Sequence, residues 1–175
     1  MCLSLVGSEM CIRDRPGPSN VPAAVQQAIH CPMEDHRNPT IPDLIQPITE
    51  DLKKILLTKD GKVVFFPSSG TGCWEAALQS TLNVGDKVLG ASFGQFSMLW
   101  LDMCKRLKFE PITMEEEWGT GANPESYHKH LSEDKNHEIK AVLVCQNETA
   151  TGVRSDVAAI RKILDDLNHP ALLMV

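Results

Sequence analysis

The sequence has no excess of positive charge and no long apolar run. Its 175 residues include 17 lysines and arginines against 23 aspartates and glutamates, which gives a formal net charge of −6. This balance argues against a nucleic-acid partner and against a polybasic membrane contact, because both need clustered basic side chains. No apolar segment approaches the roughly 20 residues of a membrane-spanning helix. We therefore expect neither nucleic acid nor a membrane as a partner.

Paired cysteines and clustered metal ligands are also missing. No cysteine belongs to a CxxC pair, and the histidines are dispersed along the chain. The cysteines are Cys2, Cys11, Cys31, Cys73, Cys104 and Cys145. Their spacing predicts reduced thiols without a disulfide framework, and it predicts no metal site.

The first fifteen residues, MCLSLVGSEMCIRDR, lack the basic start, apolar core and cleavage site of a signal peptide. The segment from Glu9 to Asp14 back-translates to the common end of transposase-type sequencing adapters. We interpret residues 1–15 as an adapter artefact and exclude them from the fold prediction.

From Pro16 onward, helical and strand patterns alternate after an extended start. Apolar spacing predicts helices at residues 21–30, 42–57, 72–82, 95–107, 124–131 and 155–167. Short apolar runs predict strands at residues 62–66, 87–91, 109–114, 140–145 and 171–175. Pro47 suggests a kink or a late start of its helix, and Ser155 is the expected N-cap of the last helix. The alternation predicts an α/β fold with a mostly parallel sheet and helices on both faces.

The first candidate site is the run PSSGTGCWEAA, residues 67–77, between a predicted strand and a predicted helix. Glycines let a backbone approach an anion, and a helix N-terminus supplies free N–H groups. Thr71 adds a hydroxyl. The pattern is neither a P-loop nor GxGxxG. Spacing alone leaves two alternatives open, a phosphate-binding loop and a glycine-rich turn without a ligand.

Two further motifs follow predicted strands. In Gly90–Phe96, an aromatic ring either stacks on a flat ligand or packs under the next helix. In Gln146–Gly152, polar side chains either contact a ligand or, as for Glu148 and Asn147, cap the following helix. Because ligands bind at the carboxyl ends of parallel strands, we expect all three motifs to meet at one edge of the sheet.

Ser69–Ala77, Phe93–Ser97 and Asn147–Gly152 together resemble the serine–glyoxylate and alanine–glyoxylate aminotransferases. These are class V pyridoxal-phosphate (PLP) enzymes with the aspartate-aminotransferase-like fold. Pro16–Pro22 and His36–Pro39 resemble the N-terminal arm of that family.

Two more segments, Trp118–Gly121 and Lys135–Lys140, point to the serine–glyoxylate branch. The resemblance implies an arm with helices at residues 16–58 and an incomplete PLP-binding large domain at residues 59–175. The chain is then expected to be the N-terminal fragment of a longer parent.

The resemblance also implies roles for individual residues. The loop that holds the PLP phosphate corresponds to Gly70, Thr71, Gly72 and Cys73. Phe93 corresponds to the aromatic that stacks on the pyridine ring, and Thr149 to the hydroxyl beside the ring's phenolic oxygen. The arm segment that folds over the substrate pocket corresponds to Pro18, Ser19 and Asn20.

Catalytic residues of the family are missing from this sequence. PLP chemistry needs a lysine that forms a Schiff base and an acidic partner for the pyridine nitrogen. In the family the aspartate directly follows the strand that matches residues 171–175, and the lysine and a carboxylate-binding arginine come later. No lysine here matches that position, so the chain as given is expected to be inactive.

The parent is expected to transfer an amino group from serine or alanine to glyoxylate with PLP as cofactor. Its partners would be small amino acid and 2-oxo acid substrates and a second copy of itself. Its compartment would be the peroxisome in a photosynthetic eukaryote and the cytoplasm otherwise. Two alternatives stay open: another class V PLP enzyme, such as a cysteine desulfurase or a kynureninase-like lyase, and a non-catalytic module that binds a phosphate-containing ligand or dimerises.

Overall fold

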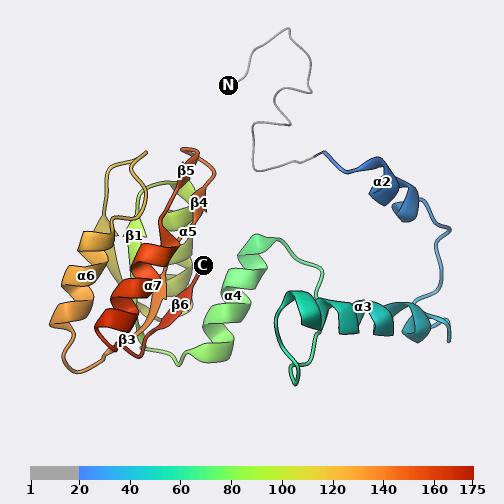
Figure 1. Cartoon of the computed structure of the whole chain (residues 1–175), viewed down its shortest axis with the longest axis horizontal. Coiled ribbons are helices and arrows are strands. Elements are labelled where there is room, and N and C mark those ends of the chain that lie inside the picture. The colour runs from blue at the N-terminus through green and yellow to red at the C-terminus, as the bar shows by residue number, and fades with distance from the viewer. Residues whose placement is uncertain (1–19) are drawn as a thin grey trace, which may run out of the picture. The chain divides into compact units, whose positions relative to one another are not determined.

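The computed structural model describes residues 20–175, which belong to two compact units divided after Pro67 (Figure 1). The interpretation of residues 1–15 and the roles of Pro18 and Ser19 therefore lie outside the described residues. Among the described residues, no helix is both long enough and apolar enough to cross a membrane.

The first unit contains two helices, both predicted from the sequence. They are α2 (Ala23–Ile29) and α3 (Ile41–Ile55). Pro42 occupies the first turn of α3, where its missing N–H costs no hydrogen bond. Pro47 lies inside α3, so the helix does not begin late.

The prediction of a buried strand at residues 62–66 is wrong. The structure assigns no strand there, and Val64, Phe65 and Phe66 are 66%, 50% and 82% exposed. A run of β-branched and aromatic residues indicates only that a segment is able to form a strand. The strand itself needs a neighbour for its N–H and C=O groups, and no described strand pairs with this run.

The second unit is built on a parallel sheet of four strands in the order β2-β1-β3-β6. The strands are β1 (Lys87–Ser92), β2 (Glu110–Glu115), β3 (Ile139–Leu143) and β6 (Leu172–Met174). All four were predicted, and the α/β class with a mostly parallel sheet is confirmed.

Helices cover both faces of this sheet. They are α4 (Gly70–Thr81), α5 (Gln95–Arg106), α6 (Pro124–Glu133) and α7 (Val157–Asp166). Successive strand side chains point to opposite faces. Val88 therefore packs in one core with Trp100 of α5, whereas Leu89 packs in the other with Ile160 of α7.

A short antiparallel hairpin follows β3 where the sequence indicated only a polar loop. It consists of β4 (Asn147–Glu148) and β5 (Val153–Arg154). Two residues per strand are too few to show an alternating pattern, so periodicity could not reveal it.

The expected N-cap of α7 is also wrong by one residue. Asp156 is the cap, and its carboxylate accepts the N–H of Ala159 at 3.0 Å. Ser155 is buried, and its hydroxyl instead donates to the Cys145 carbonyl at 2.9 Å and accepts the Ala122 N–H at 3.1 Å. The serine thus satisfies buried backbone groups that would otherwise lack partners.

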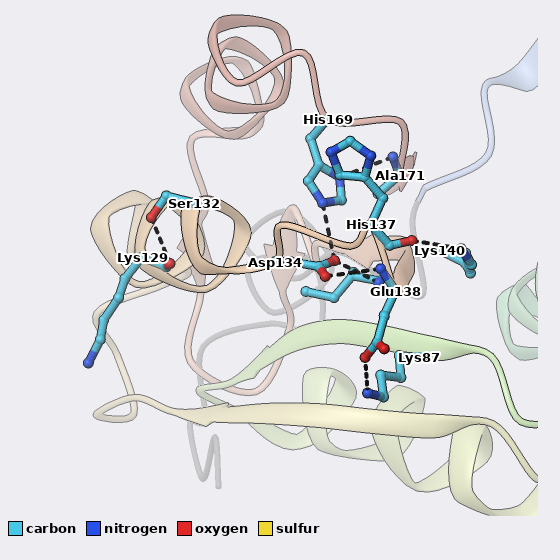
Figure 2. Close-up of polar contacts among 10 residues, drawn as sticks. Lys87, Lys129, Ser132, Asp134, His137, Glu138, Lys140, His169 and Ala171 are labelled. Carbon is cyan, nitrogen blue, oxygen red and sulfur yellow. Dashed lines mark hydrogen bonds and ion pairs between the residues drawn. The ribbon is translucent and has the colours of Figure 1, made fainter.

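A polar cluster ties the amino-terminal ends of the strands together (Figure 2). Asp134, just after α6, accepts the backbone N–H groups of Glu138 at 3.0 Å and Ile139 at 2.8 Å. His169, just before β6, places Nε2 3.3 Å from Asp134 and accepts the Ala171 N–H through Nδ1 at 3.2 Å. Because Nδ1 accepts, the proton of the neutral ring lies on Nε2 and is donated to Asp134.

This cluster predicts a pH-dependent contribution to stability. Burial acts to raise the pKa of Asp134, but hydrogen bonds from Ile139, Glu138 and His169 outweigh it and hold the pKa below the ordinary 3.8. A lowered folded-state pKa stabilises the fold above the unfolded pKa, and that contribution is lost as the pH falls through the folded pKa. Asp134→Asn should therefore cost about 1–2 kcal/mol near neutral pH and less near about pH 3.5.

Urea unfolding of both proteins at the two pH values measures this difference. The control is Asp102→Asn, because Asp102 is exposed and pairs with Arg106 one helical turn away. An Asp134→Asn penalty that is the same at both pH values would contradict the assignment.

Candidate functional site

The first motif forms the N-terminal turn of α4. Ser69 is the N-cap in an extended conformation, and its side chain makes no capping hydrogen bond. The first N–H groups of the helix, those of Gly70 and Thr71, therefore have no intrahelical partner. Gly70, Thr71 and Cys73 are exposed. This turn fits an anion the size of a phosphate group, held by backbone N–H groups and the positive end of the helix dipole.

The two glycines of this turn face different surroundings. A Cβ atom on Gly72 would overlap the Ser68 side chain, whose own Cβ would lie 2.9 Å away. A Cβ atom on Gly70 would meet nothing within 4 Å. The close approach of the chain to itself therefore requires glycine at position 72, whereas position 70 has room for a side chain.

Aromatic side chains join this turn to the second motif. Trp74, in the first turns of α4, stacks on Trp100 with ring centroids 4.8 Å apart and planes 8° apart. Trp74 also meets Phe96, in the first turn of α5, edge to face at 6.4 Å. The start of α4 and the start of α5 therefore lie side by side.

Phe93 follows β1, but its ring is buried with 0% exposure in the core that contains Leu89 and Tyr127. In this conformation the ring presents no face to a flat ligand. It does not pack under the next helix either, because the buried apolar side chains of α5 belong to the core on the other face of the sheet. The exposed aromatic here is Phe96, which is 37% exposed. Stacking by Phe93 stays a prediction.

The third motif forms the hairpin after β3. Thr149 lies exposed next to β4, whereas Glu148 is 1% exposed. The Glu148 carboxylate accepts the backbone N–H groups of Phe96 and Ser97, each at 3.0 Å. Glu148 thus caps a helix, but the helix is α5, not the one that follows it in the chain. The contact spans 51 residues, so no local pattern could have indicated it.

Tyr127 of α6 joins β1 and β3 beneath these motifs. The β1–β3 pairing ends at Gly90 and Leu143. There the Tyr127 hydroxyl accepts the Ala91 N–H at 3.1 Å and donates to the Leu143 carbonyl at 2.9 Å. Burial raises the pKa of Tyr127, so the hydroxyl keeps the proton that it donates. One side chain therefore supplies partners for the last backbone groups of both strands.

These contacts connect the three motifs in pairs, although the first motif does not follow a strand. Trp74 links the first motif to the second, and Glu148 links the second to the third. The arm residue Asn20 is exposed and belongs to the first unit. The roles assigned to the individual residues remain predictions.

Comparison with known proteins gives consistent results. Residues 14–175 match the family model described as Aminotransferase class-V. Two curated relatives are serine–glyoxylate aminotransferases, from Hyphomicrobium methylovorum with 59% identity and from Methylorubrum extorquens with 54% identity. Each match covers 91% of this chain and 40% of the relative.

A similar solved structure is the ureidoglycine–glyoxylate aminotransferase from Bacillus subtilis, with a TM-score of 0.74 and 25% identity. That match covers 91% of this chain and 40% of the solved chain. The chain thus spans about 40% of the length of the curated relatives that it matches.

Proposed function

The chain belongs to the class V aminotransferase family, and from this premise we propose that it supplies the phosphate-binding part of a PLP site. The whole enzyme would transfer the amino group of serine or alanine to glyoxylate. The observation that carries the proposal is the first turn of α4, which has no side-chain cap and lies beside the second motif. The serine–glyoxylate relatives support the choice of reaction.

The residues of the three motifs would bind and orient the cofactor. In the turn Gly70–Cys73, the free backbone N–H groups of Gly70 and Thr71 would hold the phosphate, and the Thr71 hydroxyl would donate to it. Thr149 would contact the phenolic oxygen of the ring. Stacking by Phe93 on the ring would require its side chain, which is buried in the structure, to leave the core. When bound, PLP acts as an electron sink for the amino acid's α-carbon.

In the family, the site also contains residues that have no counterpart in this chain. The covalent lysine and the acidic partner of the ring nitrogen match no residue here. Pro18, Ser19 and Asn20 would cover the pocket for small amino acid and 2-oxo acid substrates. We propose a homodimer, located in the peroxisome in a photosynthetic eukaryote and in the cytoplasm otherwise.

Ligand titration of the chain tests the phosphate site. Tryptophan fluorescence is the readout, because Trp74 lies one turn from the proposed phosphate contacts. We expect PLP to bind, inorganic phosphate to compete with it, and pyridoxal without phosphate to bind at least about tenfold more weakly, a difference of about 1.4 kcal/mol. Equal binding of PLP and pyridoxal would contradict the proposal, because it would show that the phosphate makes no contact.

A further inference from the structure

The Glu148 carboxylate forms several hydrogen bonds that are not part of the β4–β5 pairing. One carboxylate oxygen accepts the N–H groups of Phe96 and Ser97, each at 3.0 Å. The other accepts the N–H of Ala150 at 3.1 Å. A buried carboxylate with three backbone donors fixes two segments relative to each other, here the start of α5 and the turn that carries Thr149.

Gly94 makes this contact possible. A Cβ atom at that position would overlap the Glu148 side chain at Cγ, Cδ and Oε2. The backbone of Gly94 is extended, so an alanine there would meet no backbone penalty. The absence of a side chain at position 94 therefore serves the approach of Glu148 to α5.

The Ser97 side chain forms hydrogen bonds within the second motif. The Ser97 hydroxyl accepts the N–H groups of Phe93 at 3.1 Å and Gly94 at 3.0 Å, and it donates to the Gly94 carbonyl at 3.0 Å. Glu148 holds the Ser97 N–H, so it fixes this turn onto the hairpin. Phe93 and Thr149, the two residues assigned to the cofactor ring, thus depend on one carboxylate for their relative position.

The negative group at the start of α5 is the Glu148 carboxylate and not the neighbouring Cys145 thiol. Cys145 Sγ lies 4.0 Å from Glu148 Oε2. Burial, and then the Glu148 charge, raises the pKa of the Cys145 thiol to about 11, so the thiol is neutral near neutral pH. The positive end of the α5 dipole is thereby matched by Glu148, whereas the start of α4 has no such side chain.

We propose that Glu148 is a positioning residue of the cofactor site. It holds the turn Phe93–Ser97 at a fixed distance from the hairpin turn that carries Thr149. This inference rests on the proposed function. We expect loss of the Glu148 carboxylate to weaken binding of the cofactor ring and to leave phosphate affinity unchanged.

The test compares ligand binding by the full chain and by Glu148→Gln. Glutamine keeps the length of the side chain but turns an N–H donor toward backbone donors. We expect PLP to bind about tenfold more weakly, with inorganic phosphate affinity within about twofold of the unsubstituted chain. Hydrogen exchange at Phe96, Ser97 and Ala150 should be faster, because their acceptor is weakened.

Two further variants sharpen the test. Gly94→Ala should give the same pattern, because its Cβ displaces Glu148 while leaving the carboxylate in the chain. Glu133→Gln makes the same chemical change on the exposed surface of α6 and should leave both affinities unchanged.

The outcomes separate this inference from the proposed function. If PLP affinity in Glu148→Gln and Gly94→Ala equals that of the unsubstituted chain, Glu148 is only a helix cap and the positioning role is overturned. Equal losses of PLP and phosphate affinity would also overturn it, because they would indicate general loosening of the fold. If the unsubstituted chain binds neither ligand, the proposed function fails and this role fails with it.

Discussion

Gly72→Ala should weaken PLP binding by about thirtyfold, or about 2 kcal/mol, which is the value of one lost charge-assisted hydrogen bond. The added Cβ would overlap the Ser68 side chain and force the turn at the start of α4 to move. The N–H groups of that turn would no longer point at the phosphate together. Fluorescence titration with PLP and with inorganic phosphate measures the effect, and both ligands should lose affinity equally.

The chain offers a matched control and a rescue for this change. Gly70→Ala adds the same methyl group two residues earlier, where it meets no protein atom within 4 Å, so it should leave the turn in place and lower affinity less than Gly72→Ala does. Ser68→Gly removes the atoms that the new Cβ would overlap, so the double variant should bind PLP nearly as well as the unsubstituted chain. If Gly72→Ala binds PLP normally, α4 does not hold the phosphate.

Tyr127→Ala should lower the free energy of unfolding by about 4 kcal/mol or more. Removing a fully buried aromatic ring costs about 3–5 kcal/mol, and two backbone groups would also lose their partners. Because those groups, on Ala91 and Leu143, lie where the β1–β3 pairing ends, the loss should also loosen this edge. Urea denaturation measures the change.

Tyr127→Phe separates the hydroxyl from the ring. It keeps the packing and should cost about 1–3 kcal/mol, because the Ala91 N–H and the Leu143 carbonyl are left buried and unpaired. A Tyr127→Phe chain as stable as the unsubstituted one would show that the hydroxyl bridge contributes nothing. A loss equal to that of Tyr127→Ala would instead show that the ring packing contributes nothing.

Much of the second unit could be predicted from its sequence, because its elements depend on local pattern. The apolar runs at β1 and β3 are buried on both faces of the sheet, and such strands stand out as continuous hydrophobic segments. The run at residues 62–66 is also mostly apolar but forms no strand. Composition gives a segment the ability to pair, whereas pairing depends on a neighbour far away in the sequence.

The candidate site also contains features set by local sequence and features set by tertiary packing. The turn at the start of α4 could be predicted, because the first N–H groups of any helix lack intrahelical partners by local geometry alone. The burial of Phe93 and the reach of Glu148 to α5 could not, because both depend on how segments about 50 residues apart pack together. The hydroxyl bridge of Tyr127 between two strands is likewise a tertiary contact.

A chimeric enzyme tests the central claim most directly. Residues 16–175 would replace the matching segment of the serine–glyoxylate aminotransferase from Hyphomicrobium methylovorum, with which the chain shares 59% identity. Transamination of serine with glyoxylate is then measured in the chimera and in its Gly72→Ala form. We expect the chimera to bind PLP and transfer the amino group, and Gly72→Ala to raise the PLP concentration needed for half-maximal activity. A chimera that folds, as shown by circular dichroism, but neither binds PLP nor transfers the amino group would contradict the account.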